Sequence, residues 1–540
     1  MSSEKQVTAC EDSDDCHRLT GNRNLQLIQP TLISTYSKDK DLIEPTKGSV
    51  SALTRRAGKR SDRMQVTMSI LANLTVLSSG MGLGYSAITL HSLTQEDDPL
   101  RLNPDQASWF ASINSIACPF GGLIAGYLLD RIGRKWTLIF INILSIASWT
   151  LIAISSSTNF DLMYTQIMIA RVIIGLVIGL VSATAAIYSA EIATPRLRGR
   201  LTVLTSLAIA VGILMIYSFG YVIPENFRLV AVIAAGCCVA SLLLLIPLPE
   251  SPAWLLSKER ETEAERSLKK IRGYGSSLKT IPEIEHELTR LRENIEAQKM
   301  AGKECFIDML KQPQVYKPLG VMIGFFAVQQ FSGIFVVVVY AAKVSSEAGV
   351  SIDPFLCTVL IGITRVIATI LVAYILDTLG RKPPSIFSGV GMAVCMFGIA
   401  ACIYNPLPGG LRWIPTFLII TYIFTSTLGF LTMPFSMTAE LFPQKVRGPA
   451  SGITIFFAYL MSFVIIKLYP TMVEQMGSAN VFIFYGTISV FGILFVYYIV
   501  PETKGKSLQE IEDYFRGKSS TRRSSRSADD DCAKLSTSVV

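Results

Sequence analysis

Charged side chains recur in three signatures, and each half of the chain carries all three. Residues 130–135 read Asp-Arg-Ile-Gly-Arg-Lys, and residues 377–382 read Asp-Thr-Leu-Gly-Arg-Lys, about 247 positions later. The other repeats follow in the same order at nearly the same offset: Glu191 with Arg198-Gly199 and Glu440 with Arg447-Gly448, then Pro249-Glu250-Ser251 and Pro501-Glu502-Thr503. These residue types offer ion pairing, because a guanidinium can bind a carboxylate through two parallel hydrogen bonds. The repetition indicates an ancient duplication of a membrane bundle, since each signature stands where a long apolar run ends.

The signatures predict a gate at the cytoplasmic ends of the spans. We expect the carboxylates of Asp130 and Asp377 to accept hydrogen bonds from the N-terminus of a neighbouring helix, where the helix dipole favours negative charge. We expect each signature arginine to pair with the glutamate of its own half, and such pairs would hold the cytoplasmic side of a two-state transporter shut. The predicted gate comprises Asp130, Arg131, Arg134, Glu191, Arg198, Asp377, Arg381, Glu440 and Arg447. A bias of basic residues toward inner loops explains the arginines, but it requires neither the acidic residues and glycines nor their repetition.

Two polar features interrupt the apolar runs and are candidates for a binding site. Gln329 and Gln330 supply amides in the seventh run, where they suit a hydroxylated solute and a contact between helices equally well. Arg365 lies about nine residues into the eighth run, where an unpaired charge is costly and usually faces the bundle interior. Its five donors could bind substrate hydroxyls or an anionic group. They could also bind free carbonyls of a broken helix, and the sequence leaves both interpretations open.

The elements that must position these residues are transmembrane helices. Half of the 540 residues are hydrophobic and only 17% are charged, a balance that a soluble chain of this size would not show. A span needs about 20 apolar residues. About twelve fit, at roughly 65–90, 107–129, 136–156, 163–189, 201–223, 227–247, 318–342, 356–376, 383–404, 414–437, 449–472 and 478–500. The predicted fold is an all-α polytopic membrane protein with two six-helix bundles, residues 64–247 and 318–500.

The remaining segments are polar. We expect a disordered N-terminal tail over residues 1–63, a helical cytosolic linker over 248–317 and a cytosolic tail over 501–540. In the linker, Ile284, Leu288, Leu291 and Ile295 recur at helical spacing after Pro282, which suits a first helical turn.

The basic residues set the predicted orientation. Lys and Arg gather before the first span and in alternate loops, which places those loops and both termini in the cytosol. The net charge of +8 therefore reflects membrane topology and gives no reason to expect nucleic-acid binding. We expect a multi-pass protein of the plasma membrane whose partners are a small solute and the lipid bilayer, with no obligate protein partner.

The sequence predicts neither coupled transport nor catalysis. Proton- or sodium-driven transporters usually keep a titratable carboxylate or His inside the membrane. Here no Asp or Glu lies well inside a run, and His17, His91 and His286 lie in tails, a linker or a span end. No nucleophile with its base, phosphate loop or metal cluster is present, so we expect no enzyme activity, no cofactor and no metal.

The signatures together resemble the sugar porter family of the major facilitator superfamily, which includes the facilitative glucose transporters. The resemblance covers about residues 64–515 and adds Arg171 in span four, Gln329 through Ile334 with its Gly333, and the glutamates Glu250 and Glu502. It implies that the Gln pair contacts sugar and that Arg171 is structural or contributes to gating. The phrase Pro252-Ala253-Trp254-Leu255-Leu256 and span seven are most similar to the insect branch, the facilitated trehalose transporter-like proteins.

The expected binding site departs from the glucose-transporting members. Those members carry Gln where Ser206 stands, Asn at Phe335 and Arg365, Trp at Phe435, and Asn-Trp at Ala458-Tyr459. Each lost amide removes a partner worth roughly 1 kcal/mol, so the resemblance does not imply glucose specificity. The break in span ten is reduced to Gly429 and Pro434. The candidate substrate contacts are Gln329, Gln330, Ser206, Phe335, Tyr340, Arg365, Phe435 and Tyr459.

Three functions remain in view. The leading hypothesis is a facilitative transporter for trehalose or a hexose that works by rocking two bundles about a central site. A second is a sensor that binds sugar without transporting it, suggested by the reduced set of polar site residues and the two long polar tails. A third is a transporter for a different, anionic solute recognised by Arg365.

Overall fold

The computed structural model describes residues 47–94, 101–224, 226–274, 282–300, 309–405, 408–443, 446–506 and 508–516. It separates into two units, Met1–Ala57 and Gly58–Val540. Residues 1–46, most of the tail predicted to be disordered, lie outside the described residues. Helix α1 (Lys47–Leu93) includes residues 47–63, so this part of the predicted tail is helical.

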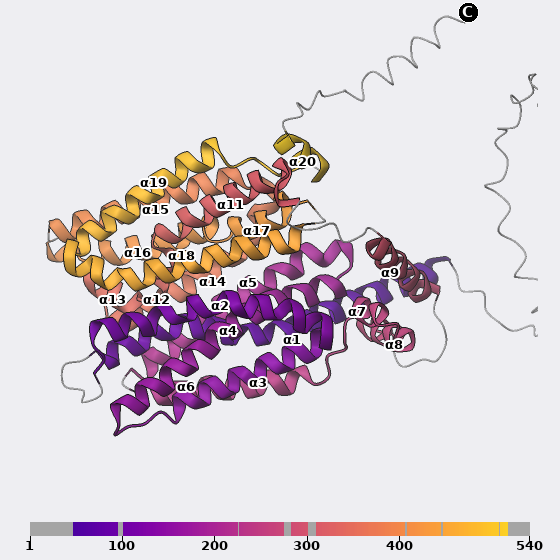
Figure 1. The fold of residues 1–540 in the computed structure, drawn as a ribbon, viewed down its shortest axis with the longest axis horizontal. Helices are drawn as coiled ribbons and strands as arrows, with labels where there is room; N and C mark the ends of the chain where they lie inside the picture. Colours follow the sequence, from indigo (N-terminus) through magenta and orange to yellow (C-terminus); the bar gives the residue numbers. More distant parts are fainter. Residues whose placement is uncertain are drawn as a thin grey trace, which may run out of the picture. The chain divides into compact units, whose positions relative to one another are not determined.

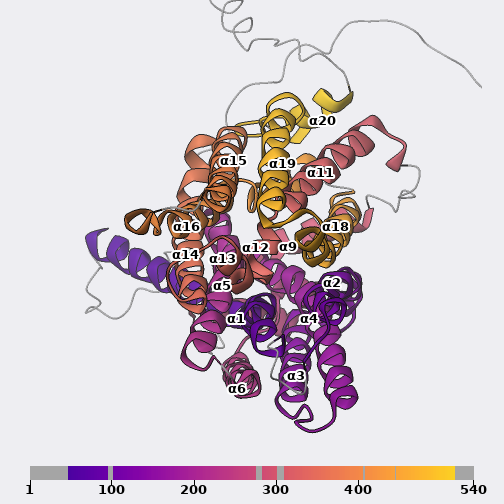
Figure 2. The same ribbon diagram turned by 90° about the vertical axis from the view of Figure 1, so that its left-hand side faces the viewer.

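The long helices of the second unit form two groups that follow the two halves of the chain. Figure 1 shows the first-half helices, coloured indigo to magenta, on one side and the orange to yellow helices of the second half on the other, and Figure 2 shows the same division. The first bundle contains α1, α2 (Pro104–Ile132), α3 (Arg134–Ala153), α4 (Phe160–Ile192), α5 (Pro195–Val222) and α6 (Phe227–Leu245). The second contains α11 (Pro313–Phe331), α12 (Ile334–Val339), α13 (Ala341–Glu347), α14 (Pro354–Leu379), α15 (Lys382–Tyr404), α16 (Ile414–Leu428), α17 (Met433–Leu441), α18 (Arg447–Met476) and α19 (Ser478–Tyr498).

Within the described residues, eleven helices are long and apolar enough to cross a membrane. They expose large apolar side chains, among them Leu123, Leu243, Val394 and Phe491. A soluble monomer rarely exposes so much apolar surface, whereas a bilayer accommodates it. The chain is therefore a multi-pass membrane protein.

Short polar residues set where several of these helices begin. The side chains of Asn159 and Asn226 each accept a hydrogen bond from the backbone N–H three residues on, at 3.1 and 3.0 Å. Asp353 does the same for the N–H of Phe355 at 2.6 Å. Such caps satisfy donors that the first helical turn leaves free, so the loops at this end of the bundles fix the helix starts locally.

The seventh span differs from the single helix expected over 318–342. It is divided into α11, α12 and α13 and continues to Glu347. The break falls at Gly333, whose φ of 88° is left-handed, and a Cβ there would lie 2.7 Å from a ring carbon of Tyr485. Only glycine meets both requirements. All six residues of α12 are buried, so this short helix lies inside the protein.

The tenth span is also broken, although its sequence keeps few breaking residues. Helix α16 ends at Leu428 and α17 begins at Met433, with Pro434 buried in its first turn. A Cβ at Gly429 would lie 2.5 Å from the Cβ of Ser388, so α15 packs directly against the break. One glycine and one proline therefore suffice to interrupt this span.

The linker contains α7 (Pro252–Ser257), α8 (Glu261–Ile271) and α9 (Pro282–Met300), with α9 starting at Pro282. Arg272 connects the linker to the first bundle, because it pairs with Glu287 and donates to the carbonyl of Ile192 at 3.0 Å. In the C-terminal tail, α20 (Leu508–Arg516) buries Ile511 and Phe515. The rest of the predicted tail, residues 517–540, lies outside the described residues.

Candidate functional site

The first-half signatures form one hydrogen-bonded cluster. Arg134 donates to Glu191 Oε1 from Nη2 at 2.7 Å and from Nε at 3.2 Å. The carboxylate of Glu250 accepts the backbone N–H groups of Arg134 at 2.8 Å and Lys135 at 3.1 Å. Glu250 therefore caps the N-terminus of α3 while Arg134 links α3 to α4, and burial raises the pKa of the Glu250 carboxyl above its usual range.

The second half repeats this cluster. Arg381 pairs with Glu440 at 2.5 Å, and Glu502 accepts the backbone N–H groups of Arg381 and Lys382 at 3.0 and 2.8 Å. Here burial also acts to raise the pKa of Glu502, but four backbone N–H donors outweigh it and leave the pKa below its usual range. The two copies share geometry but differ in electrostatics.

A glycine in each signature makes this approach possible. Gly133 is the only residue between α2 and α3; its φ is 90°, and a Cβ there would lie 2.5 Å from the Glu250 carboxylate. Gly380 has a φ of 85°, and its Cβ would lie 3.0 Å from Glu502. In both halves the glycine turns the chain and leaves space for the capping carboxylate.

The expected role of Asp130 is not observed. The carboxylate of Asp130 is exposed and bonds to no residue that the structure describes, and the side chain of Asp377 lies outside the described part. Glu250 and Glu502 take the role instead, since they follow spans six and twelve and lie beneath the N-termini of α3 and α15. Sequence reasoning identified these glutamates only as motif residues.

The signature pairs lie within bundles and not between them. Arg134–Glu191 joins α3 to α4, and Arg381–Glu440 joins α15 to α17. Of the other predicted gate residues, Arg131 bonds the Tyr127 hydroxyl and Arg198 is exposed. Glu191 Oε2 and Arg447 Nε are buried without a hydrogen-bond partner among the described residues. In this conformation the signatures stabilise each bundle.

Contacts between the bundles gather at the opposite end. Lys467 of α18 donates to Asp105 Oδ1 at 2.5 Å and to Ser108 Oγ at 2.7 Å, both on α2. Its Nζ also lies 4.5 Å from the ring centroid of Trp109, and that ring packs on Phe463. We call Lys467, Asp105, Ser108 and Trp109 the Lys467 cluster. Sequence reasoning missed it, although a single Lys inside the apolar run 449–472 was a usable signal.

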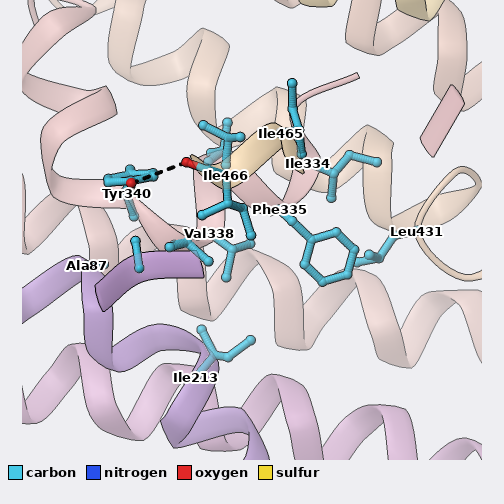
Figure 3. Close-up of a cluster of buried hydrophobic side chains, with 14 of the residues drawn as sticks. Ala87, Ile213, Ile334, Phe335, Val338, Tyr340, Leu431, Ile465 and Ile466 are labelled. Atoms are coloured by element: carbon cyan, nitrogen blue, oxygen red, sulfur yellow. Dashed lines mark hydrogen bonds between the residues drawn. The ribbon is translucent and has the colours of Figure 1, made fainter. Parts of the chain in front are cut away.

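An apolar layer beside this cluster closes the same end. Figure 3 shows Val338 of the α12 segment beside Ala87 of the first bundle, with Ile213 of that bundle below and Phe335 extending toward Leu431. The Tyr217 hydroxyl donates to the carbonyl of Val338 at 2.6 Å across the bundle boundary. Phe335, a predicted substrate contact, is thus buried among apolar side chains.

The two predicted glutamines have different surroundings. Gln329 donates its amide to the carbonyls of Phe430 and Leu431 at 2.8 and 3.0 Å, which are the free carbonyls of the span-ten break. Its neighbour Gln330 keeps a buried Oε1 without a hydrogen-bond partner among the described residues. Gln329 therefore acts as a contact between helices, while Gln330 retains an acceptor for a ligand.

Arg365 is buried on α14 without an internal partner. Its side chain is 7% exposed, and its guanidinium forms no hydrogen bond or ion pair with the residues that the structure describes. Arg365 lies where α14 packs closely against α5. Three residues before it, an added Cβ on Gly362 would lie 3.0 Å from the Cα of Leu214. Tyr217 of α5 is its electrostatic neighbour. Bonds to broken-helix carbonyls, one of the two interpretations of this residue, are not formed.

The remaining predicted contacts are dispersed. Tyr340 donates to the Ile466 carbonyl at 3.3 Å, and Tyr459 lies near Cys118 across the bundle boundary. Phe435 packs its ring against Phe326, and Ser206 is exposed on α5. Gln330 and Arg365 are therefore the candidate contacts with buried polar groups still available.

Arg171 has a structural role. It donates to the carbonyls of Phe110 at 3.1 Å and Gly82 at 2.9 Å, and it also bonds the Ser86 hydroxyl. Its guanidinium lies 4.7 Å from the Phe110 ring centroid. Arg171 thus ties α4 to α1 and α2. Among the described residues, no group of three His, Cys, Asp or Glu side chains could hold a metal ion.

Comparison with known proteins assigns the family. The profile described as "Sugar (and other) transporter" matches residues 72–515. This chain belongs to the sugar transporter family. Among its relatives, the facilitated trehalose transporter Tret1 of Apis mellifera ligustica is 31% identical over 88% of this chain and 94% of that protein. The facilitated trehalose transporter Tret1-2 homolog of Drosophila simulans is 30% identical over 84% and 91%, respectively.

Solved structures of sugar transporters share the fold. The inward-open conformation of the xylose transporter XylE from E. coli aligns with a TM-score of 0.70 at 25% identity, over 83% of this chain and 99% of that one. A transporter of the POT family aligns with a TM-score of 0.56 at 12% identity, over 81% and 96%, which is a likeness of fold alone. The chain therefore has the major facilitator fold that the sequence predicted.

Proposed function

We propose that this family member carries a neutral sugar, with trehalose as the first candidate, down its concentration gradient by alternating access. The observation that carries the proposal is the pair of available polar groups, Gln330 Oε1 and the Arg365 guanidinium, buried within the bundles. A sugar offers hydroxyls that both donate and accept, so its hydroxyls match the chemistry of an amide oxygen and of a guanidinium. The relatives named as facilitated trehalose transporters support this choice of sugar.

Uncoupled transport is part of the proposal. The acidic residues of the described spans lie near helix ends: Asp62 before the apolar part of α1, then Asp105, Asp130, Asp161, Glu191, Glu347, Asp377, Glu440 and Glu474. Since a proton-driven carrier usually keeps a titratable group within the membrane, the gradient of the sugar itself would drive the flux. We assign no catalytic activity to the chain.

The proposed orientation places the signatures and both termini in the cytosol, as the distribution of basic residues favours. The Lys467 cluster would then lie on the extracellular side, and the structure would represent a state closed to the outside. We propose the plasma membrane as the location, because a carrier of an extracellular sugar acts there.

Flux measurements test the proposal. Proteoliposomes containing the purified protein should take up labelled trehalose saturably, and excess unlabelled trehalose inside should accelerate entry by exchange. A proton ionophore should leave the initial rate unchanged. Loss of uptake with the ionophore would contradict uncoupled transport, and saturable trehalose binding without flux would favour a sensor.

The unpaired Arg365 favours one second candidate, a transporter for an anionic solute. A buried guanidinium without a carboxylate partner is a strong site for a carboxylate or phosphate. Loss of a hydrogen bond to a charged group costs about 1.5–3 kcal/mol, which is roughly a 10- to 150-fold loss of affinity.

Two substitutions of one residue separate the candidates. Under the sugar proposal, Arg365→Asn retains an amide donor and acceptor, so trehalose flux should persist. Under the anion proposal, Arg365→Asn should abolish flux of the anion, whereas Arg365→Lys should retain part of it by keeping the charge. Abolition of trehalose flux by Arg365→Asn in a protein that melts normally would show that sugar recognition requires the guanidinium.

A further inference from the structure

A surface groove lies at the signature end of the second bundle, away from the proposed sugar site. It is enclosed by α11, α19 and the C-terminal α20, has a volume of about 620 Å³, and is lined by Tyr316, Lys317, Gly320, Val321, Phe495, Ile499, Tyr514 and Phe515. Apart from one lysine, every lining residue is apolar or aromatic. The groove is therefore suited to a long apolar ligand that carries a polar group at one end.

The groove is lined by apolar side chains on a surface of the kind that faces lipid. Ile499, which lines the groove just after α19, is 48% exposed, and Phe491 and Leu494 of α19 are exposed apolar residues of the same span. An added Cβ on Gly320 would meet no atom within 4 Å. One turn deeper, a Cβ on Gly324 would lie 2.7 Å from the Phe495 ring, so this ring closes the deep end. The open end faces the membrane surface.

Positive charge is placed at that open end. Lys317 donates to the carbonyl of Phe515 at 3.2 Å, and an ammonium group has three donors, so two remain available. Lys506 is exposed with its Nζ 5.7 Å from the Tyr514 ring centroid. The acidic residues Glu510 and Asp513 precede Phe515 by five and two positions, which places them on the opposite face of α20.

We propose that this groove binds one anionic phospholipid of the leaflet at the signature end, the cytosolic leaflet in the proposed orientation. An acyl chain lies along Gly320, Val321 and Phe495, and the headgroup phosphate binds the ammonium groups of Lys317 and Lys506. The lipid then joins α20 to both α11 and α19. It links the C-terminal helix to the broken seventh span, since α11 is the first part of that span.

Site-resolved photo-crosslinking tests the proposal with the full-length protein in phosphatidylcholine vesicles. The probes are phosphatidylserine and phosphatidylcholine with the same diazirine-bearing acyl chain, and peptide mass spectrometry quantifies the label on residues 316–321 and 495–499. A basic residue near an anionic leaflet contributes about 1 kcal/mol, or roughly fivefold. With two such lysines, the serine probe should label these segments about 25-fold more than the choline probe, and Lys317→Gln should reduce that preference to about fivefold.

Matched variants separate the groove from general attraction to lipid. Gly320→Leu fills the groove without a clash and improves helix propensity, so it should abolish labelling by both probes. Gly236→Leu, at an exposed glycine of α6 with equally open surroundings, should leave labelling at the wild-type level, as should Lys59→Gln. Wild-type labelling in Gly320→Leu would overturn the proposal. The proposal would also be overturned if Lys59→Gln lost as much labelling as Lys317→Gln. It would be overturned as well if soluble glycerophosphoserine, at the same concentration as the lipid probe, prevented the labelling.

Discussion

The Lys467 cluster predicts how the end opposite the signatures, extracellular in the proposed orientation, is held closed. Lys467→Met retains most of the apolar stem but removes the ammonium group, and with it the bonds to Asp105 and Ser108 and the contact with Trp109. These contacts join α2 to α18, so they exist only while the two bundles meet at this end. Their loss should shift the population toward the outward-open state, because only differential stabilisation moves such an equilibrium.

The size of the shift follows from the exposure of the groups. The Asp105 side chain is 78% exposed, so its pair with Lys467 is screened by water and contributes about 0.2–1 kcal/mol. The cation–π contact with Trp109 adds about 0.5–1 kcal/mol at an exposed site. Together they amount to about 0.7–2 kcal/mol, so the ratio of open to closed protein should rise roughly 3- to 30-fold.

A native thiol can report this change. Cys118 of α2 is 1% exposed and lies near Tyr459 of the opposite bundle. Parting of the bundles would expose it, so a membrane-impermeant maleimide added outside should label Cys118 about 3- to 30-fold faster in Lys467→Met, with Cys118→Ser as the blank. High salt should narrow the difference, since it screens exposed pairs.

The control is a lysine at the same end with a partner in its own helix. Lys343 lies 3.9 Å from Glu347 within α13, so Lys343→Met removes a similar charge but no contact between bundles. Its labelling rate should equal that of the wild type. Equal rates for Lys467→Met and Lys343→Met would refute the reasoning that the Lys467 cluster holds this end closed.

Three further predictions concern the signatures and the broken spans. Gly133→Ala should lower the melting temperature of the purified protein, because a positive φ with an extended ψ strains alanine by about 1–3 kcal/mol and its Cβ would displace the Glu250 carboxylate; an unchanged melting temperature would contradict this. Glu502→Gln should destabilise more than Glu250→Gln at pH 7, since the pKa of Glu502 is lowered and that of Glu250 is raised. The ionised Glu502 carboxylate stabilises the folded protein above its ordinary pKa of 4.5, and this stabilisation is lost as pH falls through the lowered pKa of the folded state. The difference in melting temperature between Glu502→Gln and the wild type should therefore shrink below pH 4.5. Gln329→Ala should cost about 1–3 kcal/mol of stability by leaving two buried carbonyls unpaired, while trehalose binding by fluorescence titration stays near the wild-type value; a loss of binding alone would place Gln329 in the site.

Repetition made the arginine–glutamate pairs of the signatures predictable, but it did not identify the carboxylates that cap the helices. The Arg134–Glu191 pair and its counterpart were expected because opposite charges recur at one membrane face. The replacement of Asp130 by Glu250 as the helix cap could not be read from the sequence, because the two glutamates lie about 115 positions from the helices that they cap. Such non-local pairing depends on how six helices pack, which no local pattern encodes.

The central residues were harder to predict for a related reason. A glutamine in an apolar helix serves a ligand or a neighbouring helix equally well, and the break near Phe430 decided in favour of the neighbouring helix for Gln329. Gln330, the next residue, points elsewhere on the helix and keeps its acceptor free. The family resemblance implied the same role for both glutamines. Consecutive residues of a helix point in different directions, so the two side chains have different surroundings.

Alternating access requires bundles that are rigid within and weakly joined to each other. Inside each bundle this chain uses charge-assisted bonds at partly buried sites, as in Arg134–Glu191 and Arg381–Glu440, which survive rigid-body rocking because both partners move together. Between the bundles it uses a screened pair at Lys467 and an apolar layer around α12, contacts that one state can exchange for others at small cost. If the Lys467 contacts contribute only about 0.7–2 kcal/mol, binding of one sugar with a few hydrogen bonds suffices to shift the balance. The duplicated signatures therefore make each bundle rigid, and the weaker contacts between the two bundles allow the bundles to move relative to each other.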